Sequence, residues 1–151
     1  MGKLVSQRNI KWEGDLFNLF LFPYQFAQVA PQTVHSCDIL AGSWGTVGST
    51  ILWTYNVGGA KNVAKEIVEA IDKKKKSIAY KVIEGDPLKF YSEFKIICEV
   101  HESSGHDNLV TYTLEYEKRN VESPEPTGFM DLLLHQFSKE VDDCSHRLQP
   151  N

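Results

Sequence analysis

The segment GSWGTVG, residues 42–48, runs directly into STILWTY, residues 49–55, and this junction decides between two fold classes. Glycines at intervals of three are typical of the phosphate cradle of a nucleotide-binding α/β protein. Such a cradle is followed at once by a helix, whose first amide groups converge on the anion. Here β-branched and aromatic residues follow instead, which indicates a strand. We therefore expect a strand-to-strand turn rather than a nucleotide site, and its characteristic residues are Gly42, Trp44, Gly45 and Gly48.

Strand-like segments extend in both directions from this turn. An N-terminal strand is expected over residues 3–12, and turn signals separate the other six segments. Hydrophobic and polar residues alternate along the last three of these, so each has one apolar face and one solvated face. This alternation predicts a single antiparallel sheet whose apolar face packs against another part of the chain. The six segments are His35–Leu40, Thr50–Asn56, Val63–Ile71, Ser77–Glu84, Phe90–Val100 and Leu109–Lys118.

Helical segments lie before and after the strands. We expect a short helix over residues 16–22, capped by Asp15, and a second over residues 24–30. Both are too apolar to stand alone on a surface, so we expect them to close one end of the sheet. The stretch Thr127–Leu148 predicts one long amphipathic helix. Its apolar stripe consists of Met130, Leu133 or Leu134, Phe137, Val141, Cys144 and Leu148. The pattern as a whole predicts an α+β fold in which a strongly curved sheet grips this helix.

Composition narrows the class of protein. A chain of 151 residues is expected to form one domain, residues 1–151. The net charge of −4 argues against a nucleic-acid partner, and we interpret the lysines at 73–76 as a solvated hairpin tip. Three widely spaced cysteines indicate free thiols in a reducing compartment. No apolar run reaches the roughly 20 residues of a membrane span. We therefore expect a cytoplasmic protein without a membrane span, and nothing in the pattern requires more than a monomer.

Two short motifs leave alternatives open. Gly2 with Ser6 matches the loose pattern for N-terminal acylation, although Gly2 can equally precede the first strand. The five histidines lack the spacing of a zinc site, and we expect no metal and no cofactor.

The interior of the sheet is open to two interpretations. Five of the inward aromatic residues carry a polar tip, which suits either a core with satisfied hydroxyls or a ligand cavity. Glu66 faces inward if Ala64, Val68 and Ala70 share its face. In the other register, Val63, Lys65, Ile67 and Ile71 face inward instead. A buried Glu66 would have a raised pKa and could accept a proton or anchor a ligand hydroxyl. The five aromatic residues are Trp53, Tyr55, Tyr80, Tyr112 and Tyr116, and we place Trp44 and Trp53 near the cavity.

Four segments together carry a resemblance to a known family. They are GSWGTVGS (42–49), AKEIVEAID (64–72), KVIEGD (81–86) and EYEK (115–118), and they occur in the expected order along nearly the whole chain. The chain resembles the plant major latex proteins, a branch of the birch-pollen-allergen and pathogenesis-related class-ten superfamily. The resemblance implies a helix-grip, START-like fold, with seven antiparallel strands curled around the C-terminal helix and two short helices closing one end.

The resemblance also implies a function. Members enclose a large hydrophobic cavity that binds steroids, flavonoids, alkaloids or cytokinin-like hormones, are associated with defence and stress, and include allergens. Some relatives, such as norcoclaurine synthase, are enzymes that use a pocket lysine, but Ile78 stands where that lysine is expected. The residues expected to line the cavity are Phe20, Ile51, Trp53, Tyr55, Glu66, Ile78, Tyr80, Val82, Phe94, Ile96, Cys98, Tyr112, Leu114, Met130, Leu133 and Phe137.

Three functions follow from these observations. The first is a carrier or sensor for a small hydrophobic or amphipathic plant metabolite. The second is a cavity enzyme, an isomerase or a cyclisation or condensation helper, with Glu66 as acid or base. The third is an interaction module for another protein, gated by ligand.

Overall fold

A computed structural model describes residues 1–103 and 105–148, with side chains up to His146. Within these residues, seven strands form one antiparallel sheet in the order β1-β7-β6-β5-β4-β3-β2. The strands are β1 (Gly2–Lys11), β2 (Val34–Ala41), β3 (Thr50–Val57), β4 (Ala60–Asp72), β5 (Ser77–Gly85), β6 (Tyr91–Glu102) and β7 (Asp107–Lys118). The helical segments are α1 (Leu16–Leu21), η1 (Pro23–Gln25), α2 (Phe26–Val29), η2 (Asp86–Lys89), α3 (Thr127–Asp131), η3 (Leu132–Phe137) and α4 (Ser138–Leu148). The predicted helix-grip architecture is confirmed.

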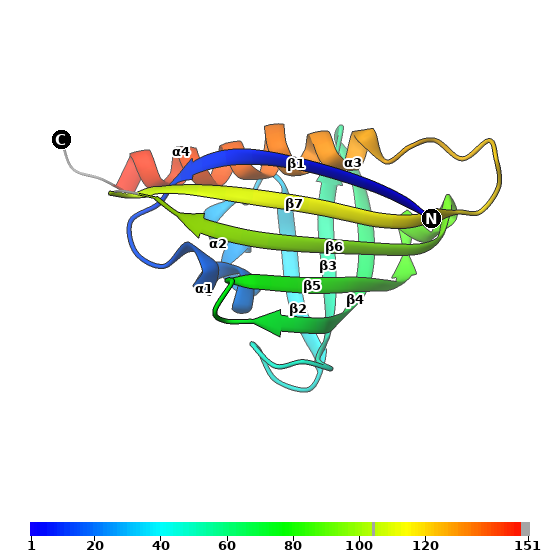
Figure 1. The fold of residues 1–151 in the computed structure, drawn as a ribbon, viewed down its shortest axis with the longest axis horizontal. Helices are drawn as coiled ribbons and strands as arrows, with labels where there is room; N and C mark the ends of the chain where they lie inside the picture. The colour runs from blue at the N-terminus through cyan, green and yellow to red at the C-terminus, as the bar shows by residue number, and fades with distance from the viewer. Residues whose placement is uncertain (104, 149–151) are drawn as a thin grey trace.

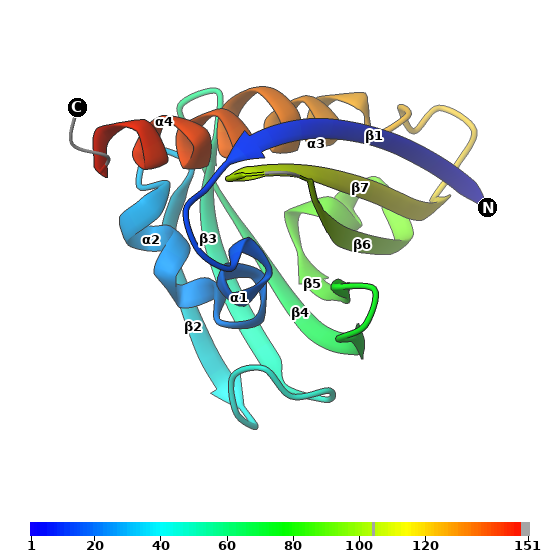
Figure 2. The ribbon, with the colours of Figure 1, turned by 60° about the vertical axis from the view of Figure 1, so that its left-hand side comes forward.

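The sheet is strongly curved. In Figure 1, β3 and β4 run steeply across the direction of β1, β7 and β6, and Figure 2 shows the sheet wrapping around its concave side. Register shifts in the β2–β3, β4–β5 and β6–β7 pairs contribute to this shape, because an extra residue in one strand bends it and increases its twist. The short helices α1 and α2 close one end of the concave side, as predicted.

The C-terminal helical stretch lies beside β1 and over the concave face (Figure 1). The Arg8 Nη1 donates a hydrogen bond to the Leu134 carbonyl oxygen at 2.7 Å, and the Lys11 amide donates to Asp142 Oδ1 at 2.6 Å. At the other side, Glu140 accepts hydrogen bonds from the amides of Gln32 and Thr33 at 2.7 and 3.0 Å. Helix and sheet are therefore tied together on both sides of the interior.

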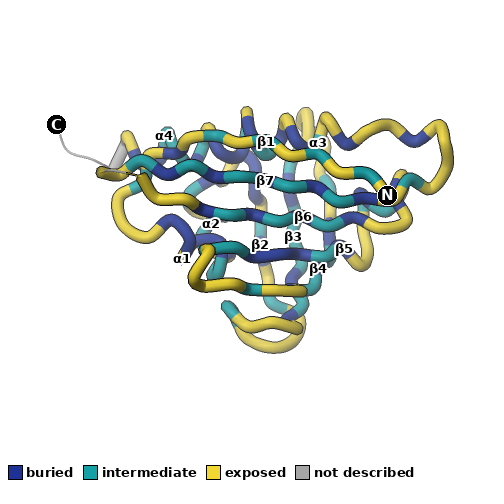
Figure 3. Tube along the Cα trace, in the orientation of Figure 1, coloured by how far each residue is buried: buried dark blue, intermediate teal, exposed yellow. Residues whose placement is uncertain are grey.

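The alternation that predicted the sheet is clearest in β6 and β7. Phe94, Ile96, Cys98 and Val100 are buried from β6, and the intervening residues from Lys95 to Glu99 are half-buried on the outer face. Figure 3 shows this alternation of buried and more exposed positions along both strands. Phe90, predicted as the first residue of this strand, lies before β6 and is exposed.

Strand β4 adopts the register in which Glu66 faces inward. Ala64, Glu66 and Val68 are buried, as that register predicts. The prediction for Ala70 is wrong, because a register shift between Val68 and Ala70 turns Ala70 out to solvent and packs Ile71 against the core. Each of the two registers considered is therefore correct for one part of the strand.

The predicted C-terminal helix is present but is not uniformly α-helical. Residues 132–137 form the π-helical segment η3 between α3 and α4. The wider turn buries Leu132 and Leu134 and leaves Leu133 half-buried, whereas the predicted stripe has Leu133 or Leu134 alone. Phe137, Val141 and Cys144 are buried as predicted, and the side chain of Leu148 lies outside the described residues.

Two smaller expectations are resolved at the N-terminal end. Asp15 precedes α1, but its side chain makes no capping hydrogen bond, so the predicted cap is wrong. Gly2 lies inside β1 opposite Tyr116, where an added Cβ would fall 2.3 Å from the tyrosine ring. Strand pairing alone therefore accounts for this glycine, and acylation stays a prediction. No helix in the described part of the chain is long and apolar enough to cross a membrane.

Candidate functional site

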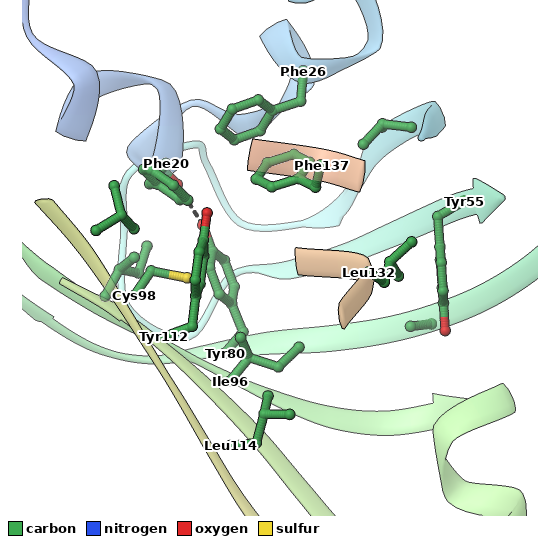
Figure 4. Close-up of a cluster of buried hydrophobic side chains, with 14 of the residues drawn as sticks. Phe20, Phe26, Tyr55, Tyr80, Ile96, Cys98, Tyr112, Leu114, Leu132 and Phe137 are labelled. Carbon is green, nitrogen blue, oxygen red and sulfur yellow. Dashed lines mark hydrogen bonds between the residues drawn. The ribbon is translucent and has the colours of Figure 1, made fainter. Parts of the chain in front are cut away.

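A cavity of about 80 Å³ lies between the concave face of the sheet, the short helices and η3. Figure 4 shows the arrangement: Phe20, Phe26 and Phe137 come from the helical side, and Tyr80, Cys98 and Tyr112 come from the sheet. The lining is Phe20, Phe26, Thr33, Val34, Trp53, Tyr55, Ala64, Glu66, Tyr80, Ile96, Cys98, Tyr112, Phe129, Leu132, Leu133 and Phe137.

Ten of the sixteen residues predicted for the cavity line it. The other six are buried but face the packed core around it: Ile51, Ile78, Val82, Phe94, Leu114 and Met130. Strand alternation assigns a residue to the inner face, but it does not tell whether a ring or a void lies opposite.

Six lining residues were not predicted. Ala64 shares the Glu66 face, so the sequence did contain a signal for it. Phe26 belongs to the second apolar helix, and Thr33 and Val34 precede the predicted start of their strand. Phe129 and Leu132 lie off the predicted helical stripe, and η3 brings Leu132 to the cavity.

The glycine loop lies outside the cavity. Gly42, Gly45 and Gly48 all have positive φ, between 73° and 91°, in the turn between β2 and β3. The Trp44 ring contacts the Tyr24 ring of η1 at a tilt of 55°, with ring centroids 5.1 Å apart, and none of these loop residues lines the cavity. The strand-to-strand turn is confirmed, whereas the placement of Trp44 beside the cavity is wrong.

Aromatic rings reduce the cavity to a small volume. Phe26 contacts Phe137 and Phe20 edge to face, with centroids 4.7 and 5.2 Å apart, and Trp53 contacts Tyr80 at 6.2 Å. The resulting volume of about 80 Å³ is well below the roughly 300–1,000 Å³ of typical ligand pockets. The large cavity implied by the family resemblance is therefore absent from this arrangement of side chains.

Several polar groups at the cavity are already hydrogen-bonded. The Tyr80 hydroxyl donates to the Phe20 carbonyl oxygen, drawn as a dashed line in Figure 4. The Tyr112 hydroxyl pairs with Ser138 Oγ at 2.6 Å, and the Thr33 hydroxyl donates to Glu140 Oε1 at 2.9 Å. These three hydroxyls hold helices and loops to the sheet and do not point free donors into the cavity.

Glu66 is the single carboxyl group among the cavity-lining residues. It is 4% exposed, and burial raises the pKa of its carboxyl from the usual 4.5 to about 8, because the charged form loses its hydration. The nearby Trp53 indole opposes part of this pKa rise. At neutral pH the group is therefore mainly a neutral carboxylic acid that can both donate and accept a hydrogen bond.

Cys98 is suited to packing rather than to nucleophilic chemistry. Burial, reinforced by the negative charge of Glu66, raises the pKa of the Cys98 thiol far above its ordinary value. The thiol therefore stays protonated. No lysine lines the cavity in the described part of the chain, and no cluster of three metal-binding side chains occurs there.

Comparison with known proteins identifies the family. The model of the pathogenesis-related protein Bet v 1 family matches residues 3–146. The chain belongs to this family. Among Bet v 1 relatives, MLP-like protein 31 of Arabidopsis thaliana is 34% identical over 145 residues, which cover 94% of this chain and 84% of the relative. The crystal structure of ginseng major latex-like protein 151 from Panax ginseng has a TM-score of 0.87 and 33% identity, with 98% of each chain covered.

Other Bet v 1 relatives are longer than this chain. MLP-like protein 28 of Arabidopsis thaliana is 35% identical over 146 residues, or 95% of this chain, but the match covers 43% of that protein. The chain thus spans less than half the length of some of its curated relatives and most of the length of others.

Proposed function

We propose that the protein binds a small apolar or amphipathic molecule in the cavity between the sheet and η3. The observation that carries this proposal is an almost wholly apolar lining that contains one buried, neutral carboxyl group, Glu66. Apolar walls with a few fixed polar groups are typical of small-molecule sites. Membership of the Bet v 1 family, whose fold generally binds small hydrophobic ligands, supports the same conclusion.

The small volume implies that side chains move when a ligand enters. Phe129 and Leu133 are the lining residues best placed to move, because both are only half-buried and so reach the surface. Immobilising one flexible side chain on binding costs about 0.5–1.5 kcal/mol. A ligand that buries about 200 Å² of apolar surface gains roughly 5 kcal/mol before such costs. The expected dissociation constant is therefore about a millimolar unless polar contacts lower it.

In the cell, we propose that the protein is a cytoplasmic carrier or sensor that acts in defence or stress responses. The three cysteines are all buried free thiols, which supports a reducing compartment. We propose a plant steroid, flavonoid, alkaloid or cytokinin-like hormone as the ligand, since the chain belongs to the family in which such ligands are expected.

Ligand capture tests the proposal. Recombinant protein is mixed with a small-molecule extract of plant tissue, desalted and denatured, and the released compounds are quantified by mass spectrometry. The wild type should retain apolar compounds at up to one per chain. Ala64→Leu, which extends a side chain into the cavity, should retain none, and Val63→Leu, on the exposed face of the same strand, should behave as wild type. Equal retention by Ala64→Leu, or no retention by the wild type, would refute the proposal.

A second candidate function is proton transfer to or from a bound substrate. The observation that favours it is the Glu66 pKa of about 8, close to the pH at which a general acid or base works best. Glu66→Gln separates the two functions. A carrier with this substitution changes affinity and turns nothing over, whereas an enzyme keeps its substrate affinity and loses its rate.

A further inference from the structure

Among the buried side-chain nitrogen and oxygen atoms of the described residues, one has no hydrogen-bond partner, and it lies at the cavity. It is Nε1 of Trp53. Leaving a buried donor unpaired costs about 1–3 kcal/mol, so native structures contain few such atoms. A phenylalanine would fill an apolar wall without this cost. The indole N–H therefore calls for an explanation that packing alone does not supply.

The position of Trp53 is set by strand pairing. Trp53 lies opposite Ala64, and Glu66 lies opposite Ile51, so Trp53 and Glu66 are diagonal neighbours on the inner face of β3 and β4. Phe26 stacks on the indole at 6.4 Å and Tyr80 contacts it edge to face at 6.2 Å. These rings hold the indole in place beside the Glu66 carboxyl.

The two polar groups are close together but do not satisfy one another. The indole N–H lies close enough to the Glu66 carboxyl to lower its pKa as a hydrogen-bond donor does, but the two groups do not meet the distance and angle of a formed hydrogen bond. The Tyr80, Tyr112 and Thr33 hydroxyls are already bonded elsewhere. Together, the neutral carboxyl and the indole offer two donors, O–H and N–H, and one carbonyl acceptor.

A cyclic amide matches this set. Its carbonyl oxygen has two lone pairs, which can accept from the Glu66 O–H and the Trp53 N–H, and its own N–H can donate to the Glu66 carbonyl oxygen. An anionic ligand is disfavoured, because no lysine, arginine or histidine lines the described cavity to neutralise it. A cationic ligand would face the positive edge of the Trp53 N–H.

We infer that the cavity selects a neutral, flat ligand whose hydrogen-bond acceptor and donor are bonded to the same carbon atom, as in a lactam, and that Trp53 and Glu66 together bind these two groups. This inference rests on the proposed function and adds the ligand class to it. The hydrophobic walls supply affinity for any compact apolar molecule. Hydrogen bonds to Trp53 and Glu66 supply the preference for a lactam among such molecules.

Two probes of matched shape separate these contributions. Naphthalene has no polar group, and 2-quinolinone is a bicycle of similar size with a lactam. Their affinities are measured by calorimetry for wild type, Trp53→Phe, Glu66→Leu and the control Trp44→Phe, whose ring lies at the loop outside the cavity. Thermal unfolding of each variant confirms that it is folded.

We expect Trp53→Phe and Glu66→Leu each to lower the affinity for 2-quinolinone about tenfold, since each removes a buried hydrogen bond. Naphthalene affinity should stay within about twofold in both, and Trp44→Phe should match wild type for both probes. If naphthalene binds but the variants affect the two probes equally, the inference is wrong and the proposed function stands. If neither probe binds the wild type, the proposed function fails, and this inference fails with it.

Discussion

Neutralising Glu66 should make the stability of the protein less dependent on pH. The pKa of the Glu66 carboxyl is about 8 in the folded chain and near the usual 4.5 in the unfolded chain. Between these values the folded state holds a proton that the unfolded state has released. Raising the pH therefore favours the unfolded state, and wild-type stability contributed by this group is lost as pH rises from about 4.5 to 8.

The size of the effect follows from the same two values. A difference of 3.5 pH units corresponds to about 5 kcal/mol over the whole range, and to about 2–3 kcal/mol between pH 5 and pH 7. Burial, with a smaller contribution from the Glu66 charge, raises the pKa values of four neighbouring groups above their ordinary values of 9 to 10, so they stay neutral in this window. They are Cys37, Tyr55, Tyr80 and Cys98.

Urea unfolding of wild type and Glu66→Gln at pH 5, 6 and 7 measures this effect. The variant should gain about 2–3 kcal/mol relative to wild type between pH 5 and pH 7, which is roughly 1 M in the urea midpoint. Glu93→Gln, at an exposed position on β6, is the control and should follow wild type at every pH. Parallel curves for wild type and Glu66→Gln would refute the claim that burial keeps this carboxyl protonated.

Three further substitutions test individual contacts. Gly85 has φ +118°, and an added Cβ there would lie 2.2 Å from a backbone oxygen. Gly85→Ala should therefore lower the free energy of unfolding, measured in urea, by about 3 kcal/mol or more. The control Gly58→Ala, whose added Cβ has nothing within 4 Å, should lower it by about 1 kcal/mol. Glu140→Ala removes the acceptor of the Gln32 amide and should speed hydrogen exchange there and lower stability by about 1–2 kcal/mol. Tyr112→Phe leaves a buried serine hydroxyl unpaired and should lower stability by about 1–3 kcal/mol, measured by thermal unfolding.

Specific outcomes would contradict each of these expectations. Equal urea midpoints for Gly85→Ala and Gly58→Ala would show that the strand relaxes around the added methyl group. An unchanged exchange rate at the Gln32 amide would mean that Glu140 does not hold the loop. A wild-type melting temperature for Tyr112→Phe would mean that the hydroxyl pair contributes nothing.

The sheet could be predicted from sequence wherever strand alternation is unbroken. In β6 and β7, every second residue from Phe94 to Val100 and from Val110 to Tyr116 is buried, and the period of two was evident. In β4 the period changes at the bulge near Glu69, so neither register described the whole strand. A bulge depends on the pairing of two strands, and a single strand sequence carries little signal for it.

The cavity was harder to predict than the fold. Its volume depends on how the Phe26, Phe137 and Phe20 rings meet, and ring contacts between separate elements leave no periodic pattern. The π-helical segment changed which leucine faces inward, although the hydrophobic spacing was compatible with a plain α-helix. Trp44 was misplaced because its partner Tyr24 becomes a neighbour only when the glycine loop folds back on η1.

Locating a bound apolar probe by NMR tests most directly whether the cavity between the sheet and η3 binds apolar molecules. Isotope-filtered nuclear Overhauser effects are recorded between unlabelled naphthalene and the labelled protein. If the cavity binds apolar molecules, naphthalene should contact the methyl groups of Ile96 and Leu133 and the Phe137 ring, all of which line the cavity. Contacts confined to exposed apolar residues such as Leu40 and Val47, or no contacts at all, would contradict it.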